Sequence, residues 1–181
     1  MMQTVTPANA TRKRARVTIR PIEAVDADGL STFYASLSAE SRALRFLGAS
    51  RGISPAEALR FASVDRMVDD GFVAVVAEAG PDDGLIVGHA TLTSGGDRPP
   101  EIAFAVADAW QRRGLGTALL QAVISAAEGR GIARLAAVLR ADNVAMRRLL
   151  AHAGWSSRIT ALDGSTMDVE LERVAAGEPS E

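Results

Sequence analysis

The chain has 181 residues, of which 48% are apolar and 23% are charged, a composition that is ordinary for one globular domain. It contains no cysteine, which excludes disulfides, thiolate metal sites and a cysteine nucleophile, and its two histidines are too few for a histidine-rich metal site. The net charge of −2 gives no case for nucleic-acid binding, and no apolar run is long enough to span a bilayer. We therefore expect a cytoplasmic protein with no metal, no nucleic-acid partner and no membrane anchor.

The first half of the chain alternates between strand and helix patterns. Residues 1–15 are polar and basic without periodicity, which predicts a disordered tail. The patterns that follow are a strand over 16–20, helices over 26–37 and 39–47, and a helix that starts at Ser54-Pro55-Ala56-Glu57. That last start combines a Ser cap, a Pro at the first helical position and a Glu that completes a capping box.

The second half continues as a mixed α/β pattern. The expected elements are strands over 72–79 and 85–93 joined by a turn at 81–84, a strand over 101–106, a helix from about 114 to 128, a strand over 132–139, a helix from Asp142 or Asn143 to Gly154, and a hairpin of 159–162 with 167–171. Residues 174–181 are expected to fray. One domain over residues 16–173 between two tails follows from this pattern.

A strand, a glycine-containing turn and a helix follow one another over residues 101–117. A helix start with unpaired backbone N–H groups is an anion site. Gly114 and Gly116 carry no Cβ, so a phosphate approaches the main chain closely there, and Arg112 and Arg113 add charge-assisted hydrogen bonds. The strand begins with a carboxylate. Together these features predict a phosphate-bearing cofactor and a proton-transfer step.

Two other nucleotide motifs do not fit this segment. A Rossmann fingerprint needs a third glycine where Leu119 stands, and an acidic residue after the next strand, whereas Glu128 lies at the end of the predicted helix. A P-loop needs Gly-Lys-Ser/Thr, and the segment contains no lysine.

The segment resembles the signature of the GNAT superfamily of acetyl-CoA-dependent N-acetyltransferases, Gln/Arg-x-x-Gly-x-Gly/Ala, which stands here as Gln111 to Gly116. Downstream, Asn143 to Leu150 followed by Gly154-Trp155 resembles the family's second motif, in which an Asn contacts the cofactor and a Gly–aromatic pair ends the helix. The resemblance covers residues 16–172. It implies an α/β fold with a mixed, mostly antiparallel central sheet flanked by helices, in the order β-α-α-β-β-β-α-β-α-β-β.

The resemblance implies acetyl-CoA as the co-substrate and assigns residues to its parts. Val106 stands where the family's bulged strand offers backbone groups to the pantetheine arm and an N–H to the thioester oxyanion, and Asn143 stands where the family contacts the cofactor. The segment implied for the pyrophosphate consists of Gln111, Arg112, Arg113, Gly114, Leu115, Gly116 and Thr117.

Upstream, Ile19–Ile22, Ser36–Gly48, Ile53–Pro55 and Phe72–Val76 resemble the catalytic domain of bacterial protein lysine acetyltransferases of the Pat type. This closer resemblance implies a protein lysine as the acceptor, a homodimer, and Glu101 as the base that deprotonates the amine directly or through water. Standalone relatives with other substrates share the pattern. A small amine (a polyamine, an amino acid derivative or an antibiotic) therefore stays open as the acceptor, and so does a non-catalytic acyl-CoA-binding regulatory module.

One position departs from the family's pattern. Many members carry a Tyr seven residues after the motif Asn, as general acid for the departing thiolate, and here that position is Leu150. The only tyrosine, Tyr34, falls on the first predicted helix, where we expect it to pack. His89 and His152 are interpreted as structural. A thiolate, whose parent thiol has a pKa of about 8.5, leaves without a side-chain acid and takes its proton from water.

Overall fold

The computed structural model describes residues 16–77 and 80–174. The predicted tails, apart from Val174, lie outside these residues. The elements in chain order are β1 (Val17–Pro21), α1 (Ala27–Ser36), α2 (Ala39–Phe46), α3 (Pro55–Ala62), β2 (Asp70–Val76), β3 (Ile86–Gly95), β4 (Arg98–Val106), α4 (Leu115–Gly129), β5 (Arg134–Arg140), α5 (Val144–Ala151), β6 (Ser156–Asp163) and β7 (Thr166–Glu172). Two short 3-10 helices, η1 (Ala24–Asp26) and η2 (Asp108–Trp110), precede α1 and follow β4.

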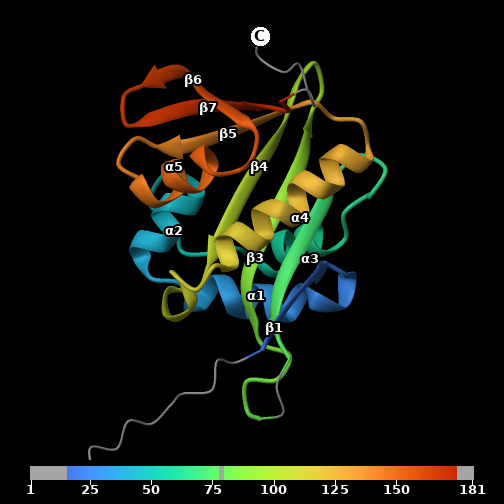
Figure 1. Cartoon of the computed structure of the whole chain (residues 1–181). Helices are drawn as coiled ribbons and strands as arrows, with labels where there is room; N and C mark the ends of the chain where they lie inside the picture. The colour runs from blue at the N-terminus through green and yellow to red at the C-terminus, as the bar shows by residue number, and fades with distance from the viewer. Residues whose placement is uncertain (1–15, 78–79, 175–181) are drawn as a thin grey trace, which may run out of the picture.

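The seven strands form one sheet in the order β1-β2-β3-β4-β5-β7-β6. Every neighbouring pair is antiparallel except β4 and β5, which run parallel and meet in register only at Glu101 and Ala136. Beyond that contact the two strands diverge, and Figure 1 shows β5 turning away from β4 on the side of α2 and α5. The predicted mixed, mostly antiparallel sheet is confirmed, and its single parallel pair opens a V at the centre of the sheet.

Helices cover both faces of the sheet (Figure 1). One face packs against α4, whose Leu119, Leu120 and Val123 are buried with Ile102 of β4. The opposite face packs against α1, whose Phe33 is buried in a second cluster. These two cores fix α4 and α1 on opposite sides of β4, so the side chains of β4 reach two different environments.

Three helices, not two, stand between β1 and β2. The additional helix is α3, at the place where the Ser54 capping box predicts a helix start. The box is formed in both directions, because Glu57 N donates to Ser54 Oγ at 3.2 Å and Ser54 N donates to Glu57 Oε2 at 2.8 Å. None of the helices in residues 16–77 and 80–174 is long and apolar enough to cross a bilayer.

Two strands, β4 and β6, begin three residues earlier than predicted. β4 starts at Arg98 because its pairing with β3 resumes at Gly95 and Arg98 after a register shift. β6 starts at Ser156, directly after the Gly154-Trp155 pair, and all eight of its residues are exposed. An exposed strand carries no buried apolar alternation, which is the signal that periodicity detects.

Candidate active site

The V between β4 and β5 holds a cleft of about 500 Å³. Its walls come from β4, β5, the start of α4, the inner face of α5 and three residues of α2, namely Ser41, Leu44 and Arg45. Of the predicted cofactor residues, Val106, Gln111, Arg112, Gly114, Gly116, Thr117 and Asn143 line it. The divergence of two strands thus brings together both sequence motifs, which are separated by a helix and a strand in the chain.

The backbone of β4 presents open polar groups to the cleft. Ala107 N donates to Val87 O at 2.9 Å, and the register pairs Gly88 with Val106. Because hydrogen-bonding directions alternate in an antiparallel pair, residues 101, 103 and 105 bond to β3, whereas Phe104 and Val106 turn their N–H groups toward β5. Since β5 has diverged there, these N–H groups face the cleft.

The strand bulge that the resemblance implied at Val106 is absent from the described pairing. The register between β3 and β4 runs without a shift from Thr93–Glu101 to Gly88–Val106, and the shift lies between Thr93 and Gly95. The Val106 N–H is therefore open to the cleft because the neighbouring strand has diverged, and no extra residue is needed to release it.

The start of α4 is an open anion site. Gly114 is its N-cap with φ +85°, and no side chain caps the first turn, so its first N–H groups are available. Arg112, at φ +57°, also takes the left-handed conformation that non-glycine residues rarely adopt. A Cβ on Gly116 would meet Leu149 Cδ2 at 3.5 Å, which is ordinary contact, so the absent side chain leaves space on the cleft side.

Two residues of the predicted pyrophosphate segment do not line the cleft. The Arg113 guanidinium stacks over the Trp110 ring, with 4.9 Å from Cζ to the ring centroid, a cation–π contact that fixes η2 against the loop. Leu115 is half-buried and packs against the α4 core. Arg112 is therefore the one arginine of this pair on the cleft wall.

A hydrogen-bond network ties α2 to this loop. The Asp108 carboxylate accepts from Ser38 N at 3.0 Å, from Ser38 Oγ at 2.7 Å and from Ser41 Oγ at 2.8 Å. Burial opposes ionisation, but these hydrogen bonds together leave the pKa of Asp108 below its usual value. Gln111 Nε2 then donates to Ser41 Oγ at 3.2 Å and to Val106 O at 3.1 Å. The side chain of Gln111 thus holds the backbone of β4.

Asn143 and Glu101 occupy different parts of the V. Asn143 caps α5, with Met146 N donating to its Oδ1 at 3.0 Å, and also lines the cleft. Glu101 is exposed at the closed end of the V and does not line the cleft. At a rise of about 3.3 Å per residue, Glu101 lies about 16 Å along β4 from Val106 and about 10 Å from Phe104.

A buried polar group that sequence reasoning missed lies under the cleft. Tyr34 and His89 are both fully buried, with 2.9 Å between Tyr34 Oη and His89 Nδ1, and their rings pack edge to face. Burial, with the charge of Arg45 adding to it, lowers the pKa of His89 to about 3. Burial also raises the pKa of Tyr34, while the charge of Arg45 and a side-chain hydrogen bond with it act in the opposite direction. Both side chains are buried, as expected for packed residues, and Arg45 lies close enough to affect the pKa of each.

At the position of the missing tyrosine, Leu150 is 1% exposed and belongs to the core next to α4. His152 does line the cleft, and its Nδ1 lies 2.7 Å from Arg148 O. Since a carbonyl only accepts, this contact assigns the proton of the neutral ring to Nδ1. No group of three or more His, Cys, Asp or Glu side chains within the described ranges could hold a metal ion.

Comparison with known proteins places the chain in a family. The model of the acetyltransferase (GNAT) domain family matches residues 16–156. An acetyltransferase of Pseudomonas aeruginosa is 32% identical over 141 residues, which cover 77% of this chain and 74% of that protein. The GNAT domain of S. lividans PAT superposes with a TM-score of 0.75 at 27% identity, over 86% of this chain and 90% of that one. The acetyltransferase yncA from Salmonella typhimurium, solved with its cofactor acetyl-CoA, has a TM-score of 0.68 at 19% identity, over 92% and 99%.

Proposed function

This chain belongs to the GNAT family of acetyltransferases, and from that premise we propose that its cleft binds acetyl-CoA and transfers the acetyl group to a primary amine. The proposal depends on one observation: the uncapped N-terminus of α4 and the open backbone N–H groups of β4 face the same cleft. Two proteins of similar structure support this cofactor. The acetyltransferase yncA was solved with acetyl-CoA, and the paia N-acetyltransferase from Thermoplasma acidophilum was solved with coenzyme A.

The proposed cofactor pose follows the polarity of the cleft. The pyrophosphate lies on the N–H groups at the start of α4, where the helix dipole and the Arg112 guanidinium both favour an anion. The pantetheine arm runs between β4 and β5 and uses the backbone of Val106 and the Asn143 side chain. Gln111 takes part through its contact with Val106 O, which keeps the strand backbone in place.

In the proposed reaction, the amine nitrogen forms a bond to the thioester carbon and the carbon–sulfur bond breaks. A lysine amine has a pKa of about 10.4, so it arrives protonated at neutral pH and needs a base, for which Glu101 is the candidate. The Val106 N–H is the candidate donor to the oxyanion, a role worth about 3–4 kcal/mol for one preorganised donor. The distance along β4 requires water between Glu101 and the amine. The thiolate takes its proton from solvent.

We propose a protein lysine as the acceptor. The support is the upstream sequence resemblance to Pat-type enzymes together with the likeness to the GNAT domain of S. lividans PAT. A small amine is the alternative acceptor, and an acyl-CoA-binding regulatory module is the alternative without catalysis. The resemblance also favours a homodimer, which light scattering of the full chain tests.

Titration calorimetry with acetyl-CoA, free CoA and NADH is the first test. Binding of the two CoA species alone supports the cofactor, and absence of CoA binding overturns it. Thiol release is then measured with acetyl-CoA and a panel of lysine-containing proteins and polyamines. Turnover with proteins supports the proposed acceptor, turnover with polyamines alone supports the alternative, and binding without turnover supports the regulatory module.

Glu101→Gln tests the proposed base. The expected result is a loss of about 100-fold or more in kcat at neutral pH with unchanged acetyl-CoA affinity, because only proton removal is affected. Part of the loss should be recovered as the pH approaches the amine pKa. The control is Glu172→Gln, which removes an exposed carboxylate from β7. Equal loss of turnover and affinity, or no loss of either, contradicts the base assignment.

A further inference from the structure

Arg45 is a half-buried arginine on the cleft wall that forms no ion pair within residues 16–77 and 80–174. Its Nε is buried and has no hydrogen-bond partner in the described part of the chain, and none of the ion pairs formed there includes it. Its neighbour Arg42, also on α2, instead donates from Nε to Ser50 O at 3.1 Å and from Nη1 to Leu37 O. Because Arg45 lines the cleft and no carboxylate in the described part of the chain forms an ion pair with it, a ligand carboxylate is the available counter-charge.

Arg45 lies on the face of β4 that is opposite to α4 and that carries the proposed base Glu101. Ala105 of β4 pairs with His89, His89 contacts Tyr34, and Phe46 packs in the same core as these residues. Alternation along the strand puts Glu101, Ala103 and Ala105 on this same face, opposite to α4. Arg45 therefore lies on the face of the sheet that carries the proposed base, and the small side chains of β4 leave room beside it.

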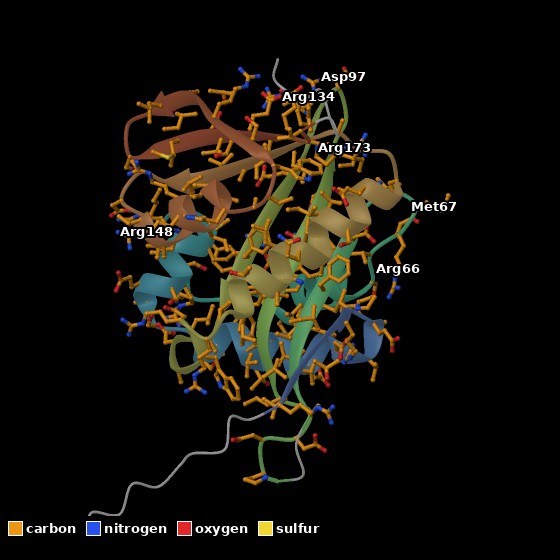
Figure 2. The ribbon with its side chains drawn as sticks, viewed as in Figure 1. Arg66, Met67, Asp97, Arg134, Arg148 and Arg173 are labelled. Atoms are coloured by element: carbon orange, nitrogen blue, oxygen red, sulfur yellow. The ribbon has the colours of Figure 1, made fainter. Side chains whose placement is uncertain are left out.

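The charges of the cleft wall are one-sided. Arg45, Arg112 and Arg148 line the cleft, and no aspartate or glutamate of residues 16–77 and 80–174 does. Arg112 adjoins the α4 N-terminus, where phosphate is expected, and Arg148 projects from α5 at the outer edge of the molecule (Figure 2). The Arg45 side chain comes from α2 on the opposite face, so these three cations serve different parts of a bound ligand.

We propose that Arg45 binds a carboxylate that the acceptor carries next to its reactive amine. The inference rests on the proposed acetyl transfer and narrows its acceptor: an acidic residue beside a target lysine and the α-carboxylate of an amino acid both supply this group. A guanidinium binds a carboxylate through two parallel N–H···O bonds, which Arg45 offers. A polyamine brings only positive charge into a cleft with three arginines and no carboxylate on its wall, and is disfavoured.

Paired acceptors test the site without changing the protein. Thiol release is compared for the blocked peptides Ala-Glu-Lys-Glu-Ala and Ala-Gln-Lys-Gln-Ala, and for L-leucine and L-leucinamide. The carboxylate member of a pair should have a kcat/KM about 10–100-fold higher, as for one charge-assisted pair. Preference in the peptide pair identifies a protein acceptor, and preference in the leucine pair identifies a free amino acid. Equal rates in both pairs, or faster rates without the carboxylate, overturn the inference.

Arg45→Gln should remove this preference while leaving acetyl-CoA affinity unchanged, and Arg45→Lys should retain part of it because charge stays but the bidentate geometry is lost. Arg51→Gln, at an exposed position beyond α2, is the matched control. An equal loss for both members of a pair, or a matching loss of acetyl-CoA affinity, overturns the inference. If no amine supports turnover in the wild type, the proposed function is at fault. Calorimetry with the glutamate peptide in the presence of CoA then tests Arg45 alone: binding weakened by Arg45→Gln supports the site, and equal binding overturns it.

Discussion

His89 is a fully buried imidazole that the fold keeps neutral, and this predicts a defined loss of stability in mild acid. Burial lowers its pKa to about 3, whereas an unfolded histidine has a pKa of about 6.5. Between these values the unfolded state takes up a proton and the folded state does not. The contribution is therefore fully present above pH 6.5 and is lost as the pH falls toward 3.

The magnitude follows from the linkage slope of about 1.4 kcal/mol per pH unit. From pH 6.5, where the unfolded histidine is already half protonated, to pH 4.5 the free energy of unfolding should fall by about 2.3 kcal/mol because of His89 alone. The carboxylates with lowered pKa values, Asp26 and Asp108, lose stability only as the pH approaches the unfolded carboxyl pKa near 4, so they add little in this window.

Urea unfolding at pH 7.5, 6.5, 5.5 and 4.5 measures this dependence, with His89→Gln as the test variant. Glutamine keeps a polar group opposite the Tyr34 hydroxyl but does not titrate. The variant should be less stable at pH 7.5 and nearly independent of pH down to 4.5. His152→Gln, which removes the exposed histidine, should retain the wild-type slope. A His89→Gln slope equal to the wild-type slope would refute the reasoning.

Two further predictions concern the loop that follows β4. Asp108→Ala removes the acceptor for Ser38 N, Ser38 Oγ and Ser41 Oγ, so the unfolding free energy should drop by about 1–2 kcal/mol and the Tm by about 2–8 °C in scanning fluorimetry; an unchanged Tm would show that α2 is held by other contacts. Gly114→Ala forces a Cβ into φ +85° at a cost of about 1–2 kcal/mol and should weaken acetyl-CoA binding in calorimetry. The control is Gly96→Ala, at φ +64° and outside the cleft lining, which carries a similar strain and should leave acetyl-CoA binding unchanged. If both variants weaken acetyl-CoA binding equally, the proposed phosphate role of the loop before α4 is wrong.

Local sequence patterns made the fold and the glycine-containing loop before α4 predictable. The helix expected over 114–128 is found over Leu115–Gly129, because the glycine at its start and an apolar 3.6-residue period are visible in the sequence. The strand expected over 101–106 corresponds to the C-terminal two thirds of β4. Both GNAT motifs come to one cleft, while the roles of Glu101, Val106 and Asn143 stay predictions. In each case the prediction depended on residues whose conformation is set by residues close to them in the sequence.

The rest of the site depends on contacts between distant residues, for which sequence has no local signal. Ser41 and Asp108 are 67 residues apart and meet only because η2 folds back beside α2. Tyr34 and His89 are 55 residues apart, and neither residue type predicts the other. Arg45 looks like any helical surface arginine until the sheet buries its Nε. An arginine can be proposed as a ligand-binding group only when the structure shows that no nearby carboxylate of the protein pairs with it.

The structure of the cleft is compatible with the absence of the family's tyrosine at position 150. Leu150 is buried against the α4 core rather than on the cleft wall, so a phenol at this position would need both new space and a new direction. His152 is the nearest imidazole on the wall, but its contact with Arg148 O uses Nδ1–H, so the neutral ring has only an acceptor left at Nε2. A thiol pKa of about 8.5 makes coenzyme A thiolate a weak base near neutral pH. In the proposed reaction, the demanding proton transfer is therefore the removal of a proton from the amine, for which Glu101 is the candidate base, and solvent suffices for the sulfur.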